Sequence, residues 1–118
     1  MVTRPHEVPR HMEQEIYEAI QIFVKSSPYR WEQHIRYHDE PIWILKLEES
    51  QIVKRIQLAV FDEPDGLFFH IIPDHSGLSN KERQELRNKG RDYRIHVPDE
   101  FSKDKLVTVL NAIQKMLR

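Results

Sequence analysis

The sequence predicts an α+β fold, in which an antiparallel meander sheet carries the N- and C-terminal helices on one face. Three observations lead to this fold class. Four consecutive segments between residues 29 and 73 have the pattern of strands, short turns connect them, and apolar residues recur at helical spacing near both ends of the chain. Runs of strands with helices segregated around them are typical of α+β domains. The predicted order is α-β-β-β-β-α-β-α, within a single domain spanning residues 1–118.

The first helix is predicted from Pro9 to about Lys25. Proline suits the first helical position because its missing N–H would have no partner there. The apolar stripe of this helix has the helical period and consists of Met12, Ile16, Ala19, Ile20, Phe23 and Val24. A Ser-Ser-Pro run then ends the helix. Residues 1–8 lack an apolar period, and we expect them to be flexible.

The first two strands are predicted at residues 29–37 and 42–47. In the first, alternation with a period of two places three apolar side chains on one side, namely Trp31, Ile35 and Tyr37. The second is apolar on both sides at its start, because Ile42 and Ile44 face away from Trp43. A strand of this kind is central, or is covered on both faces.

The third and fourth strands form a predicted hairpin. Residues 51–62 alternate, and the partner strand runs from Leu67 and ends by Pro73. Between them lies a Pro-Asp-Gly turn, in which the proline presets the first turn position and Gly66 accepts a positive φ.

The second helix is predicted between Ser79 and Gly90. Ser79 and Glu82 have the spacing of a capping box, and Gly90 is a natural C-terminal stop. Only Leu86 is strongly apolar between these limits, so most of this helix should be exposed to solvent.

A short fifth strand is predicted at residues 93–97, followed by a last helix from Lys105 to Arg118. The strand alternates Tyr93, Ile95 and Val97 with polar residues. The helix has a broad apolar stripe comparable to that of the first helix, so we expect both helices to share one face of the sheet. The element order is similar to that of small secretion-chaperone-like α+β domains, which also begin and end with helices around a meander.

Composition excludes several classes of protein. The chain contains no cysteine, which removes disulfides, thiolate nucleophiles and thiolate metal sites. A formal net charge of −1 argues against a polybasic nucleic-acid binder. No apolar run approaches the roughly 20 residues of a membrane span. We therefore expect a cytoplasmic protein without a membrane partner.

No enzyme signature stands out. His34 and His38 are four residues apart, but on a strand that separation is about 13 Å, too far to share a metal ion. A second grouping, His70 with Asp74 and His75, could join a carboxylate to an imidazole in a loop. No third ligand lies nearby in the sequence, and the three glycines form no phosphate-binding loop. We assign no catalytic residue, cofactor or metal, and a metal-dependent hydrolase is the least favoured function.

Nucleic-acid binding is the alternative function. Cationic side chains alternate with aromatic ones on the first strand, and the second helix is rich in lysine and arginine. Such groups bind phosphates, and the candidates are Arg30, His34, Arg36, Lys81, Arg83 and Arg87.

Protein binding is the favoured function, because the sheet has more apolar surface than the helices can cover. If the two terminal helices share one face, apolar residues remain on the other, where the second helix offers little cover. An apolar sheet face of this kind needs a helix, a twin subunit or a partner. The predicted partner-binding residues are Ile42, Ile44, Phe68, His70 and Ile72. We expect an adaptor, assembly factor or chaperone-like protein, with a homodimer as one form of partnership.

Overall fold

The first four strands form a meander of antiparallel hairpins, and a fifth short strand extends it. The computed structural model describes residues 10–37, 40–97 and 99–117, so the predicted flexible segment 1–8 lies outside them. The sheet order is β1-β2-β3-β4-β5. The elements are α1 (Arg10–Ser26), β1 (Arg30–Tyr37), β2 (Glu40–Glu49), β3 (Ile52–Glu63), β4 (Gly66–His75), α2 (Asn80–Gly90), the 3-10 helix η1 (Arg91–Tyr93), β5 (Ile95–Val97) and α3 (Lys103–Met116). The predicted fold class and element order are confirmed.

The β3–β4 hairpin closes at the predicted Pro-Asp-Gly turn. Glu63 pairs with Gly66 across a two-residue connection, and Gly66 has a φ of 140°. Because residues with a Cβ rarely adopt this conformation, glycine is the residue that the turn requires.

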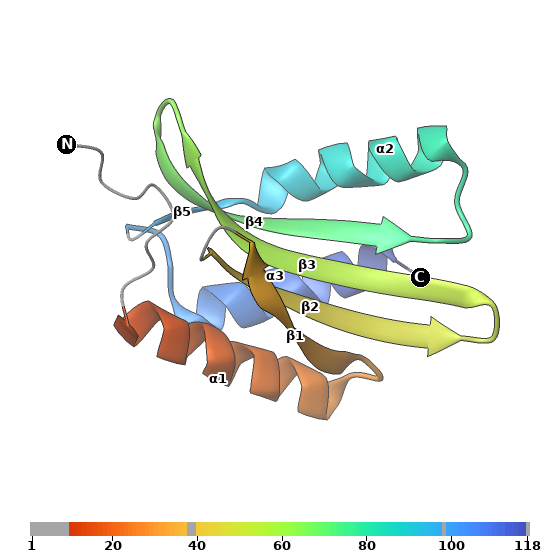
Figure 1. The fold of residues 1–118 in the computed structure, drawn as a ribbon, viewed down its shortest axis with the longest axis horizontal. Helices are drawn as coiled ribbons and strands as arrows, with labels where there is room; N and C mark the ends of the chain where they lie inside the picture. Colours follow the sequence, from red (N-terminus) through yellow and green to blue (C-terminus); the bar gives the residue numbers. More distant parts are fainter. Residues whose placement is uncertain (1–9, 38–39, 98, 118) are drawn as a thin grey trace.

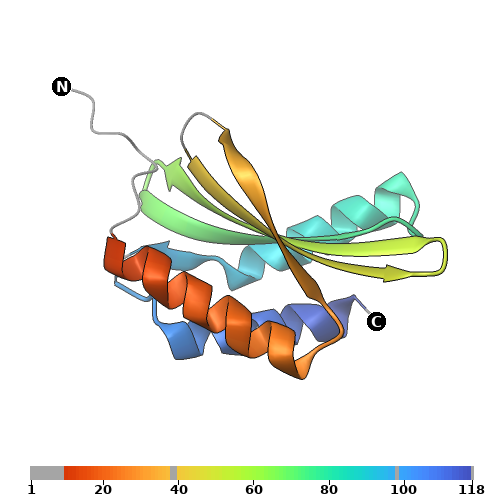
Figure 2. The ribbon, with the colours of Figure 1, turned by 60° about the horizontal axis from the view of Figure 1, so that its bottom comes forward.

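The two faces of the sheet are covered unequally (Figures 1 and 2). Helices α1 and α3 lie side by side on one face, as predicted, while α2 runs along β4 at the edge of the sheet and contributes Leu86 to the same core. The main core lies between the sheet and the α1–α3 pair, and its fully buried side chains include Ile16, Phe23, Leu45, Ile56, Leu58, Phe69, Ile71, Ile95, Leu106 and Leu110. We call the face opposite α1 and α3 the open face, because α2 only borders it, along β4.

Helix α2 begins as predicted but ends for a different reason. The Ser79 hydroxyl accepts a hydrogen bond from the Glu82 amide, and the Glu82 carboxylate accepts one from the Ser79 amide. At the other end, Gly90 has a right-handed φ of −60°, so it does not end the helix through a left-handed conformation. Instead, an added Cβ there would stand 2.6 Å from Pro73 Cδ. Gly90 therefore allows α2 to approach β4 closely.

Several local boundaries differ from the prediction. Tyr93 belongs to η1, and β5 begins only at Ile95. Strand β4 runs through Pro73 to His75 rather than ending at the proline. Proline is tolerated there because β5 pairs only with residues 67–69, which leaves β4 at the sheet edge where its missing N–H breaks no ladder. The pairing of β1 with β2 also shifts register between His34 and Tyr37.

Among the residues that the structure describes, no helix combines the length and the hydropathy needed to cross a bilayer.

Candidate functional site: a groove on the open face

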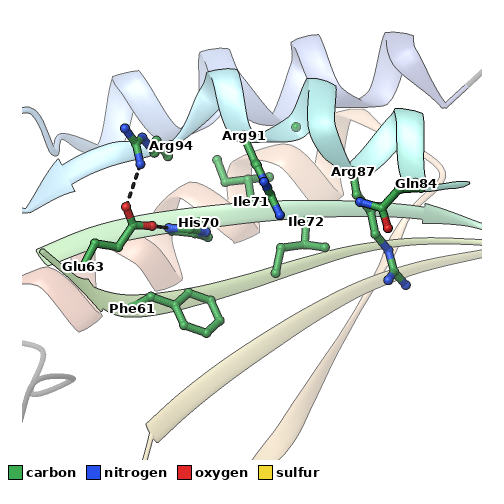
Figure 3. Close-up of a pocket in the computed structure, with 10 residues that line it drawn as sticks. Phe61, Glu63, His70, Ile71, Ile72, Gln84, Arg87, Arg91 and Arg94 are labelled. Atoms are coloured by element: carbon green, nitrogen blue, oxygen red, sulfur yellow. Dashed lines mark hydrogen bonds and ion pairs between the residues drawn. The ribbon is translucent and has the colours of Figure 1, made fainter.

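A hollow of about 600 Å³ lies between α2 and the open face of the sheet. In Figure 3, Arg87 and Arg91 extend from α2 and its C-terminal end toward the strands, and Arg94 stands further along the same side. The strands contribute Phe61 and Ile72. The hollow therefore has an apolar floor and a basic wall, and its volume is in the range of ligand-binding clefts.

A second hollow of about 390 Å³ continues the first toward β2. Both are lined by Ile72 and Arg87, so they adjoin. The second is also lined by Ile44 and Gln57, and by Glu32 at the β1 side. We refer to the two hollows together as the groove. It runs from η1 across β4 and β3 to β2.

One end of the groove is closed by a network around Glu63. The Glu63 carboxylate pairs with His70 Nε2 and also accepts a hydrogen bond of 2.6 Å from Arg94 Nη1. The Arg94 guanidinium lies 4.5 Å from the ring centroid of Phe68, within the range of a cation–π contact. Glu63 thus holds both the imidazole and one of the three arginines of the basic wall in fixed positions.

A second acidic residue, Asp74, anchors α2 to the strand. Arg83 donates from Nε and Nη2 to the two oxygens of Asp74, at 2.7 and 2.8 Å, the bidentate geometry that arginine favours. Burial raises the pKa of the Asp74 carboxyl, but the hydrogen bond and charge of Arg83, the His75 amide and the charge of Arg87 outweigh it, so the net pKa is lowered. The same pairing raises the pKa of Arg83.

The Asp74–Arg83 pair should make stability depend on pH. Because the pKa of Asp74 is lowered by folding, its contribution is fully present above the ordinary Asp value of about 3.9 and is lost as the pH falls through the lowered value. We expect Asp74→Asn to reduce the free energy of unfolding at pH 7, and this difference from wild type to shrink on acidification below about pH 4. Urea denaturation between pH 7 and pH 3 measures it.

The control for this prediction is Glu85→Gln, which removes a carboxylate from an exposed position on the same helix. Its difference from wild type should be small throughout. A penalty for Asp74→Asn that stayed constant down to pH 3 would contradict the assigned role of the Arg83 pairing.

A row of cations crosses the open face, and two of its members, Lys46 and Arg55, line the second hollow of the groove. Arg30 pairs in register with Lys46, and Lys46 with Arg55. Like charges directly opposite one another on neighbouring strands are unfavourable, and they are partly compensated by Glu48. The hydrogen bond and charge of Lys46 lower the pKa of Glu48, and the charges of Arg30 and Arg55 add to this shift. The row leaves positive charge on the sheet surface that leads into the groove.

All five predicted partner-binding residues lie on the open face. Ile44, His70 and Ile72 line the groove. Ile42 is half-buried, two residues before Ile44 on β2. Phe68 is only 9% exposed, because it lies beneath Arg94 and beside His96. The apolar surface left on this face is therefore narrower than the sequence indicated.

The predicted nucleic-acid residues do not form one patch. Arg83 and Arg87 face Asp74, whereas Lys81 is exposed two residues before Arg83, on the opposite side of the helix. Arg30 lies three strands from β4, about 14 Å away across the sheet. The side chains of His34 and Arg36 are outside the described part of the structure.

The predicted grouping of His70, Asp74 and His75 does not form a site. Because β4 continues through residue 75, the side chains of Asp74 and His75 alternate to opposite faces. His75 accepts a hydrogen bond from the Gly77 amide, while Asp74 is engaged by Arg83. Within the described residues no cluster of three or more potential metal ligands is found, and His38 lies outside them.

Sequence reasoning missed the residues that make this face a groove, chiefly Glu63, Arg91, Arg94, Phe61, Lys46 and Arg55. A signal for part of the set was present, because Arg83, Arg87 and Arg91 recur every four residues and so share one side of α2. Which side of α2 meets the sheet could not be read from that spacing.

No protein-family model matches this chain, and neither a curated protein nor a solved structure matches it at a significant level.

Proposed function

We propose that this protein is a non-enzymatic binding module that holds a partner protein in the groove on its open face. The observation that carries the proposal is the continuous hollow over β2, β3 and β4, with half-buried Ile44 and Ile72 in its floor and arginines along one wall. An apolar centre with a polar rim is the usual anatomy of a protein interface.

The test compares proteins captured by wild-type chain and by a groove variant in the cells of origin. Ile72→Glu places an unpaired charge on the groove floor, and Ile22→Glu places the same charge on α1, where Ile22 is already 45% exposed. After nuclease treatment, we expect at least one protein to be retained by wild type and Ile22→Glu and to fall tenfold or more with Ile72→Glu. Equal capture by all three, with each variant folded, would refute the proposal.

Self-association is tested separately. Sedimentation of the wild type and Ile72→Glu over a range of concentrations shows whether the partner in the groove is a second copy of the chain. A dimer that Ile72→Glu dissociates would identify it as a homodimer, whereas a monomer at high concentration directs the search to another protein.

The second candidate function, nucleic-acid binding, is favoured by the row formed by Arg30, Lys46 and Arg55. Three cations in register on an exposed sheet surface resemble a track for phosphates. Titration against single- and double-stranded DNA and RNA at two salt concentrations tests this function. Affinity that falls steeply with salt and is lost in Arg55→Glu would support it.

A further inference from the structure

Two arginines of the groove have positive charge that the chain neutralises only in part. Arg91 lines the larger hollow, and its guanidinium has no hydrogen bond or ion pair with any other described residue. Arg87 approaches Asp74 only at 3.9 Å, while Arg83 already engages both oxygens of that carboxylate. Around the whole groove, five basic side chains face three acidic ones, in a chain whose formal net charge is −1. An anionic occupant is complementary to this surface.

The spacing of the two arginines matches a particular backbone. Arg87 and Arg91 are four residues apart at the end of α2, which separates them by roughly 6 Å along the helix axis. In an extended chain, residues two apart lie on the same side at about 6.6 Å. Acidic side chains at alternate positions of an extended segment would therefore meet Arg87 and Arg91 in turn.

The opposite wall and floor accept apolar groups. An extended segment that points its acidic residues at α2 directs the residues between them away from it, toward β3 and β2. There the groove offers Phe61 and, in the second hollow, Ile44, with Ile72 of β4 in the floor. Burial of an aliphatic side chain against such a surface is favourable by about 25 cal/mol per Å² of apolar area.

We propose that the groove binds an extended acidic segment of the partner, in which acidic and apolar residues alternate. This inference rests on the proposed function and specifies the chemistry of its partner. Nucleic acid fits the groove less well, because single-stranded binding uses open aromatic faces for base stacking. In the groove, the Phe61 ring packs edge-on against His70 with centroids 4.8 Å apart. Phe68, beside the groove, lies beneath the Arg94 guanidinium.

The experiment measures fluorescence anisotropy of labelled octapeptides with the full chain. The first peptide alternates glutamate and isoleucine, the second has the same composition with all glutamates before all isoleucines, and the third alternates lysine and isoleucine. We expect the alternating acidic peptide to bind at least tenfold more tightly than the block peptide, and the lysine peptide not to bind.

Matched variants test whether the peptide binds at Arg87 and Arg91. Arg87→Glu combined with Arg91→Glu should lower the affinity for the alternating acidic peptide at least tenfold. Lys81→Glu combined with Lys89→Glu makes the same change in net charge on exposed positions of α2 and should alter affinity less than threefold. Arg91→Gln, which removes one charge without reversing it, should give an intermediate loss. Denaturation midpoints of all variants show that the fold is retained.

Four results would overturn the inference. Equal binding of the alternating and block acidic peptides, or equal losses in the two double variants, would mean nonspecific charge attraction. Tighter binding of an oligouridylate than of the acidic peptide would favour the nucleic-acid alternative. If no peptide binds but capture still finds a partner that Ile72→Glu abolishes, the acidic segment is wrong and the proposed function stands. If capture finds no such partner either, both the acidic-segment inference and the proposed function fail.

Discussion

Replacement of Phe69 by alanine is expected to lower the free energy of unfolding by about 3–5 kcal/mol, the usual cost of truncating a buried phenylalanine. Phe69 has no exposed surface. Its ring lies 5.7 Å from that of Phe101 and 6.4 Å from that of Trp43, measured between centroids. The cavity would open in the main core, where the surrounding strands cannot collapse to fill it. Urea denaturation monitored by tryptophan fluorescence and circular dichroism measures the loss.

The matched control for Phe69→Ala is Ile52→Ala. Ile52 is also an apolar strand residue, but it is 38% exposed, and its truncation should change stability by no more than about 0.5 kcal/mol. If Phe69→Ala cost no more than this control, the assignment of the α1–α3 face as the main core would be wrong.

The second large effect is expected at Gly90, where tertiary packing opposes helix propensity. Valine is preferred over glycine in a helix by a few tenths of a kcal/mol, so propensity alone predicts a slightly more stable protein. An added Cβ would, however, stand 2.6 Å from Pro73 Cδ and 3.1 Å from the Ile71 carbonyl oxygen. A proline ring and a backbone oxygen cannot move far to make room for the added atom. Overpacking of this kind lowers the free energy of unfolding by about 1–3 kcal/mol.

We therefore expect Gly90→Val to destabilise the protein by roughly 1–3 kcal/mol and to increase hydrogen exchange in α2, since the helix must move away from β4. The same variant should lower the affinity of the groove for any ligand, because the basic wall moves with the helix. Lys89→Ala, at the neighbouring exposed position, is the control and should be nearly neutral. A stabilising effect of Gly90→Val would show that α2 does not pack closely on β4.

Some elements could be predicted because their signals are local. The β3–β4 turn needs a residue that tolerates positive φ, and Gly66 provides it. The start of α2 depends on Ser79 and Glu82, which satisfy each other's amides within one turn. Strand alternation likewise placed Ile44, His70 and Ile72 on the same face before any contact was known. In each case the residues that determine the structure are within a few positions of one another.

Other elements could not be predicted because they depend on distant residues. The end of β4 was placed at Pro73, but a proline is harmful only where a neighbouring strand needs its N–H, and β5 is too short to reach it. The sequence predicted Asp74 to be a loop residue near His75. Its hydrogen-bond partner is instead Arg83, nine positions further on and in another element.

The amino-acid sequence alone was sufficient for the fold class, the order of elements and the shared face of Ile44, His70 and Ile72, since these follow from periodicity and from capping and turn residues close together in the chain. Only the tertiary structure decided how α2 packs along β4. Its orientation depends on the close approach at Gly90 and on the Asp74–Arg83 pair. Those contacts join the helix to a strand, and they leave Arg87 and Arg91 facing the groove, where an anionic partner could bind.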